Sequence, residues 1–140
     1  PDHAALNELE VMRTTPEAER AHRATSRMSE TVLNELAQVD DALNHAIDRG
    51  DIGEYLTQNY RFHTIVNTCA EAPILAATVD RLWLMFGPSL RVVCGRFGTS
   101  NLPDKHADLL AAFREGDAAK AAQAMAEDVS QGMVQIRASL

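Results

Sequence analysis

An amide and an imidazole, Asn59 and His63, stand four residues apart in the run Asn-Tyr-Arg-Phe-His. Side chains at positions i and i+4 of a helix lie about 6 Å apart on one face, so both groups can point into one cavity. His106 and Asp128 follow much later in the chain, in segments that read as two further helices. If these helices pack together, the four side chains form a pocket suited to a metal ion or a small anion.

Each of these residues also has an ordinary structural interpretation. A single His on an apolar helix face is more often a hydrogen-bonded core residue than a metal ligand. Asp128 could belong to an acidic helix surface that faces solvent, and Asn59 could be a buried amide that joins two helices without an ion. The remaining histidines, His3, His22 and His45, are predicted to lie on the surface.

The composition favours one helical domain. A chain of 140 residues can bury about 70% of its unfolded surface around a single core. Only 5% of the residues are aromatic, while Ala, Leu, Glu and Gln are frequent, which favours helices over sheets. We therefore predict an all-α fold. The formal net charge is −7 and no basic run is present, so direct binding of nucleic acid by this chain is not expected.

The cysteines and the ends of the chain bear on its compartment. Cys69 and Cys94 lack CxxC spacing and are interpreted as two buried thiols in a reducing compartment. The sequence has no signal peptide and no apolar run of the roughly 20 residues needed to cross a bilayer. We expect a soluble, cytoplasmic protein. The chain opens at Pro1 in place of a starting Met, which suggests that an N-terminal partner domain is missing.

Capping residues predict where two of the helices begin and end. Ser29 is placed to cap a helix whose apolar residues follow a four-three spacing until Gly50 ends it. Asp51, with Glu54 three residues later, forms a capping box at the start of the next helix. That helix contains the Asn-Tyr-Arg-Phe-His run.

Prolines and glycines mark the remaining boundaries. Pro16 should break or kink the first helix and begin a second piece that Thr15 caps. Pro73 opens an apolar helix, which the Gly-Pro pair at 87–88 bends or breaks. Gly116 forms a tight turn between the last two helices.

Five runs of sequence occur in an order that is informative as a set: EVMRTTPEAERAHRAT (10–25), AIDRGD (46–51), NYRFH (59–63), EAPIL (71–75) and KHADLLAAFREGDAAKAAQAM (105–125). Over nearly the whole chain they resemble the effector-binding C-terminal domain, of FCD type, of GntR-family transcription regulators of the FadR branch. The resemblance implies an antiparallel bundle of six or seven helices with a central ligand or metal pocket. It also implies a homodimer in which residues 1–140 sense the ligand, whereas DNA binds to an N-terminal winged helix-turn-helix domain absent from this chain.

The resemblance further implies a set of metal ligands. Many members hold a divalent ion with an Asp four residues before a His, a second His that opens the penultimate helix, and a third His on the last helix. His63 and His106 match this pattern, but Asn59 replaces the Asp and Asp128 replaces the third His. The altered set still offers two nitrogens and two oxygens with one negative charge. It favours a harder ion such as Mn and leaves Zn or Ni credible.

A small organic acid is the expected effector. Members of this family often direct an Arg from the position of Arg13 toward the pocket, and a guanidinium presents a fork of donors that matches a carboxylate. Arg91 is a weaker second candidate. The alternative for Arg13 is a surface salt bridge with Glu10 or Glu17.

Ligand sensing without turnover is the function that these features favour. A divalent ion held by two His and a carboxylate also occurs in hydrolases and oxygenases. However, the sequence contains no HExxH, GxSxG or Gly-rich phosphate-binding motif and no evident additional general base. A third possibility is a domain whose pocket has decayed and which only dimerises.

Overall fold

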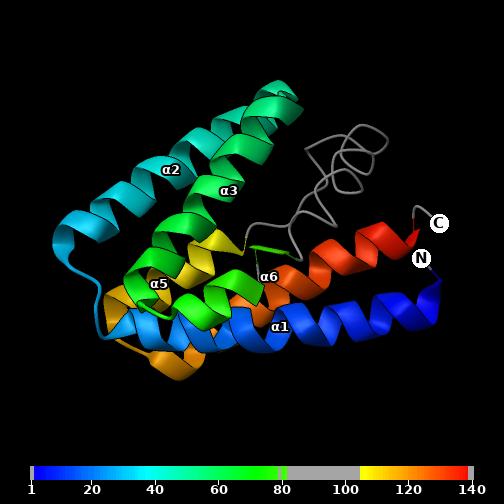
Figure 1. Ribbon diagram of the computed structural model, residues 1–140. Coiled ribbons are helices and arrows are strands. Elements are labelled where there is room, and N and C mark those ends of the chain that lie inside the picture. The colour runs from blue at the N-terminus through cyan, green and yellow to red at the C-terminus, as the bar shows by residue number, and fades with distance from the viewer. Residues whose placement is uncertain (1, 79, 82–104, 139–140) are drawn as a thin grey trace.

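The fold is an all-α bundle, as the composition predicted. The computed structural model describes residues 2–78, 80–81 and 105–138 (Figure 1). Within these ranges the helices are α1 (His3–Thr25), α2 (Glu30–Arg49), α3 (Ile52–Ala70), α5 (His106–Glu115) and α6 (Ala118–Ala138), and residues 73–78 are also helical. No described helix is long and apolar enough to cross a membrane.

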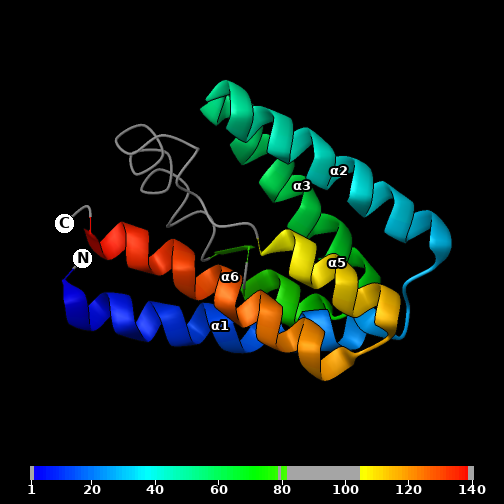
Figure 2. The same cartoon turned by 180° about the vertical axis from the view of Figure 1, so that it is seen from behind.

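The helices form two antiparallel pairs (Figures 1 and 2). Helices α1 and α6 run side by side along one edge of the molecule, with the two termini at the same end. Helices α2 and α3 form the other pair. The pairs are joined by contacts of α1 with α3, while α5 packs against both α2 and α6. Side chains from all five helices can therefore meet in the centre of the bundle.

The apolar core draws on all five helices. Because apolar residues recur every three or four positions, each helix presents one continuous apolar face to its neighbours. The largest side chains in the core that are fully removed from solvent include Leu36 of α2, Phe62 and Val66 of α3, Leu109 of α5 and Met125 of α6. This packing holds the polar side chains at the centre of the bundle in place.

The predicted caps around α2 are present. The Ser29 hydroxyl accepts a hydrogen bond from the backbone N–H of Val32 at 3.2 Å, and Gly50 ends the helix in the left-handed conformation with a φ of 67°. Asp51 caps α3 by accepting from the N–H of Glu54 at 3.1 Å. The reciprocal half of the capping box is not formed, because the Glu54 carboxylate accepts instead from Gln58 at 2.7 Å.

The break predicted at Pro16 was wrong. Helix α1 runs without interruption from His3 to Thr25 and contains Pro16 in its interior, so Thr15 is not a cap. A proline inside a helix removes its own N–H bond and crowds the carbonyl four residues earlier, but it can be tolerated where tertiary contacts support the helix on both sides. Here α1 packs against both α6 and α3. The uninterrupted helix places Arg13, Glu17 and Arg20 on one buried face.

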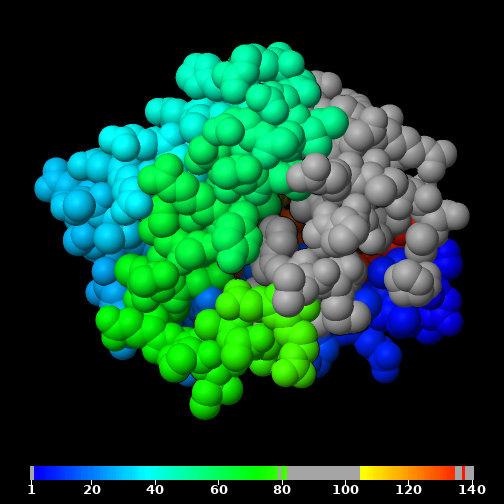
Figure 3. All heavy atoms as spheres, turned by 45° about the horizontal axis from the view of Figure 1, so that its top comes forward, coloured from blue at the N-terminus to red at the C-terminus, as the bar shows by residue number. Residues whose placement is uncertain are grey.

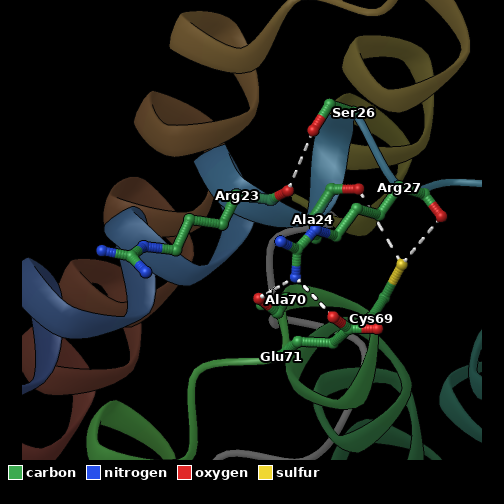
Figure 4. Close-up of polar contacts among 7 residues, drawn as sticks. All are labelled: Arg23, Ala24, Ser26, Arg27, Cys69, Ala70 and Glu71. Carbon is green, nitrogen blue, oxygen red and sulfur yellow. Dashed lines mark hydrogen bonds and ion pairs between the residues drawn. The ribbon is translucent and has the colours of Figure 1, made fainter.

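A polar corner joins the end of α1 to the end of α3 (Figure 4). The Arg27 guanidinium donates to the carbonyl of Ala70 at 3.0 Å and forms an ion pair with Glu71 at 2.9 Å. The Cys69 thiol lies 3.3 Å from the carbonyl of Arg27 and is half-buried, where the prediction was a buried thiol. Burial raises the pKa of Cys69, so the group is held as a thiol. The corner fixes where α3 ends and the 73–78 segment begins.

Three predictions lie outside the described residues: the thiol Cys94, the bend at 87–88 and the candidate effector ligand Arg91.

Loss of the α2 cap should destabilise the domain measurably. Ser29→Ala removes the acceptor for the Val32 N–H and is expected to cost about 1 kcal/mol in urea unfolding. Ser26→Ala is a matched control, because its hydroxyl makes only a 3.4 Å contact with the Arg23 carbonyl. Equal losses for the two variants would contradict the capping assignment.

Candidate metal centre

Three residues from separate helices converge at the centre of the bundle. The Asp128 carboxylate of α6 lies 3.1 Å from Nε2 of His63 on α3 and 3.6 Å from Nε2 of His106 on α5, measured from Oδ2. One ligand atom from each residue falls within 4.8 Å of the others. Both imidazoles are buried, and the Asp128 side chain is 19% exposed. Asp128 therefore faces the bundle interior, which excludes its interpretation as a solvent-facing acid.

Buried carboxylates stand behind both imidazoles. Nδ1 of His63 lies 3.8 Å from Glu17 on α1, and Nδ1 of His106 lies 3.9 Å from Asp40 on α2. In metal sites, a carboxylate at the second ring nitrogen orients the imidazole and raises the basicity of the ligating nitrogen. Glu17 also faces Arg13 at 3.4 Å. All five described helices thus contribute an ionisable side chain to one cluster.

An aromatic ring fixes the plane of His106. Phe62 stacks on this imidazole with ring centroids 4.2 Å apart and an interplanar angle of 7°. The two imidazoles meet edge to face, with centroids 5.5 Å apart. The adjacent residues Phe62 and His63 therefore have different roles: Phe62 positions the His106 ring, and His63 faces Asp128.

The two imidazoles determine the ionisation of Asp128. Burial alone would raise the pKa of this carboxyl group. The charge of His106, hydrogen bonding to both imidazoles and the charge of His63 outweigh that effect and hold the pKa well below its usual range. The carboxylate is therefore ionised throughout the neutral range, as a metal ligand must be.

The donor atoms fit a divalent ion. Tetrahedral ligands that each lie about 2.1 Å from an ion are about 3.4 Å from one another, close to the 3.1 and 3.6 Å observed between the Asp128 oxygen and the two Nε2 atoms. The charges fit as well. Around the imidazoles, Glu17, Asp40 and Asp128 outnumber Arg13 by two negative charges, which a divalent cation would neutralise.

The other predicted site residues are placed as follows. Asn59 is buried one turn before His63 on α3, and no hydrogen bond joins its amide to a described side chain. Arg13 is also buried, and it pairs with Glu17 inside the bundle rather than on the surface. His3, His22 and His45 are exposed, as predicted.

Three buried charged residues were not predicted from the sequence to lie at or beside the site. Glu17 and Asp40 face the imidazoles, and Arg20 is buried one turn after Glu17. Helical spacing contained the signal for Asp40, which lies four residues after Leu36 and three before Leu43, both core residues of α2. For Glu17 and Arg20, the helical spacing that places them on one face was hidden by the break expected at Pro16.

The comparisons with known proteins agree with the fold. Residues 8–131 match the FCD domain family, and the chain belongs to this family. Among solved structures, it is similar to E. coli McbR/YncC, with a TM-score of 0.91 and 22% sequence identity over 99% of this chain and 71% of that one. No curated protein matches the chain in sequence. The family resemblance found in the sequence is thereby confirmed.

Neutralising Asp128 should destabilise the domain in a pH-dependent way. After removal of divalent ions, Asp128→Asn is expected to cost about 1–3 kcal/mol in urea unfolding at pH 7. Because the pKa is lower in the folded chain than its unfolded value of about 3.9, the carboxylate's contribution is complete above that value and is lost as the pH falls below it. The difference from wild type should persist at about pH 5 and shrink below about pH 4.

Glu127→Gln is the control, since this neighbouring carboxylate is partly exposed and contacts Lys105 at 3.4 Å and Gln123 at 3.1 Å. A difference between wild type and Asp128→Asn that is already absent at pH 5 would contradict the assigned pKa shift.

Proposed function

We propose that this chain is the effector-binding and dimerisation domain of a GntR-type transcription regulator. In this proposal, the domain binds a small carboxylate next to a divalent metal ion and so modulates DNA binding by a separate N-terminal winged helix-turn-helix domain. The observation that carries the proposal is the convergence of two imidazoles and a carboxylate, backed by buried Glu17 and Asp40. Membership of the FCD family supports a regulatory domain rather than an enzyme.

His63, His106 and Asp128 would hold the ion, and Asn59 could add a neutral oxygen. Two nitrogens with one or two oxygens suit Mn, Zn or Ni. A bound ion would provide a positive centre with coordination positions open to a carboxylate oxygen. Other side chains position these ligands: Glu17 and Asp40 orient the imidazoles, and Phe62 fixes the plane of His106.

Arg13 is the residue that we assign to the effector. Its guanidinium is buried beside Glu17, which in turn faces His63, so it lies next to the imidazole cluster. The 3.4 Å separation from Glu17 is longer than the 2.7–2.9 Å typical of a strong charge-assisted hydrogen bond. A ligand carboxylate that bridges Arg13 and the ion would make such a bond.

Transmission of the signal would follow from where the site lies. The cluster takes one or more side chains from each of α1, α2, α3, α5 and α6, so a ligand that draws these groups together would change how these helices pack. A ligand shifts an equilibrium only by its differential affinity for the two states, typically about 1–3 kcal/mol. We expect a graded change in DNA affinity, not an all-or-none switch.

Metal binding should depend on both imidazoles. Calorimetric titration with Mn, Ni and Zn salts is expected to give one ion per chain for wild type. Affinity should fall about 100-fold or more in His63→Ala and His106→Ala, since even outer-shell partners are worth about 10–100-fold. Because protons compete with the metal for the imidazoles, affinity should also weaken as the pH falls.

His45→Ala is the matched control, because His45 is exposed on α2 and its Nδ1 lies 2.8 Å from the carbonyl of Asp41. If none of the three metals binds stoichiometrically to wild type, the domain that only dimerises becomes the better interpretation.

Effector binding should require Arg13. In metal-loaded wild type, a matching acid from a panel ranging from acetate to citrate should stabilise the fold by about 2.7 kcal/mol at a hundredfold excess over its Kd. Arg13→Met should weaken that acid's binding about tenfold or more, whereas exposed Arg23→Met should not. Unchanged affinity in Arg13→Met would mean that Arg13 only neutralises Glu17.

A further inference from the structure

A second cavity lies away from the imidazole cluster. It has a volume of about 280 Å³ and opens between α3, the segment that follows it, and Arg20 of α1. Figure 3 shows this face, with the 73–78 segment in yellow-green beside α3 in green. Thr64 and Asn67 line it from α3, Ala76 lines it from the 73–78 segment, and Glu71 and Asp80 also belong to the lining. No residue of the imidazole cluster lines this cavity.

Arg20 is the unusual group in the lining. Its side chain is only 1% exposed, and neither Nε nor Nη1 has a hydrogen-bond partner. Among the described residues, no carboxylate oxygen lies within 4.0 Å of this guanidinium, so none forms an ion pair with it. Burial lowers the pKa of Arg20, and Glu17 and Asp80 oppose that effect from a distance. The group nevertheless stays charged at neutral pH, because an arginine titrates so far above it.

Other arginines of the bundle do have acidic partners. Arg13 pairs with Glu17, Arg27 with Glu71, and Arg137 with Glu10. Glu17, which lies one turn earlier on α1, already pairs with Arg13 and faces His63. A desolvated guanidinium without a counter-charge is costly and is normally compensated by an anion. The cavity beside Arg20 has room for one.

The rest of the lining limits what that anion can be. Asp80 and Glu71 add negative charge to the lining, which disfavours phosphate and polycarboxylates and favours a ligand that also carries a positive group. Thr64 and Asn67 offer polar side chains, whereas Ala72, Pro73 and Ala76 provide a small apolar wall. One carboxylate, one ammonium group and a short apolar part describe a small amino acid.

We propose that this cavity binds a free amino acid, with its carboxylate on the Arg20 guanidinium and its ammonium group toward Asp80. Glu71 lies on the same rim but already pairs with Arg27, so Asp80 is the main partner for the ammonium group. The side chain lies against Ala72, Pro73 and Ala76. A cavity of this volume lies at the small end of ligand pockets and selects short side chains. This cavity shares no lining residue with the imidazole cluster, so it can be occupied without a metal ion at the imidazoles.

The test is a thermal-shift screen of the twenty standard L-amino acids at constant ionic strength, followed by calorimetry. It is run on wild type and on His63→Ala, which removes a metal ligand. At least one small amino acid should stabilise both proteins. In Arg20→Met its affinity should fall about tenfold or more, while exposed Arg23→Met should leave it unchanged. Arg20→Met removes an unpaired buried charge, so the variant should fold at least as well as wild type.

A second variant tests the cavity without touching the charge. Ala76→Phe should fill the space and abolish the response, whereas Ala77→Phe, on an exposed position of the same segment, should not. Propionate should bind more weakly than the amino acid of matching length, because it lacks the ammonium group. The proposal is overturned if no amino acid binds, if Arg20→Met binds as well as wild type, if the response is lost in His63→Ala, or if inorganic phosphate binds in preference.

Discussion

The Asp128 carboxylate can be held inside the bundle only because two imidazoles face it. Taking a carboxylate out of water costs several kcal/mol unless it is paired and hydrogen-bonded. His63 and His106 are themselves buried and are in turn faced by Glu17 and Asp40. Each of these buried groups is thus stable only when its polar neighbour faces it. The relative positions of five helices are therefore specified by polar contacts as well as by apolar packing.

The features that could be predicted from the sequence alone were those that depend on neighbouring residues in the chain. Ser29 and Gly50 act through backbone groups a few residues away, so their effect is readable without knowledge of the fold. The imidazoles and Asp128 were first picked out by residue type and spacing, and the family resemblance then implied that they form one ligand set across helices. Glu17 and Asp40 were missed because charged side chains are usually exposed and only tertiary structure shows that these are buried. The break at Pro16 failed for a related reason, since packing of α1 against α3 and α6 overrides the local preference.

A carboxylate at position 128 has consequences that an imidazole would not. An imidazole there would leave three such rings together, which could not all be protonated without repulsion. Asp128 instead stabilises positive charge on its neighbours, and the low pKa of its carboxyl group reflects that attraction. The same oxygen can face a metal ion or a protonated imidazole. A metal ion bound as we propose would therefore compete with protons for one set of groups.

Glu17 connects the imidazole cluster to the cavity at Arg20. It lies 3.8 Å from His63 and 3.4 Å from Arg13, and its charge also acts on Arg20 one turn later on α1. A cation near His63 would be attracted by the Glu17 carboxylate. An anion at Arg20 would neutralise the guanidinium that this same carboxylate partly compensates. Two ligands that act on one buried charge change each other's affinity by equal factors. Helix α1 also packs along α6, which carries Asp128, so a response at either pocket reaches the same pair of helices.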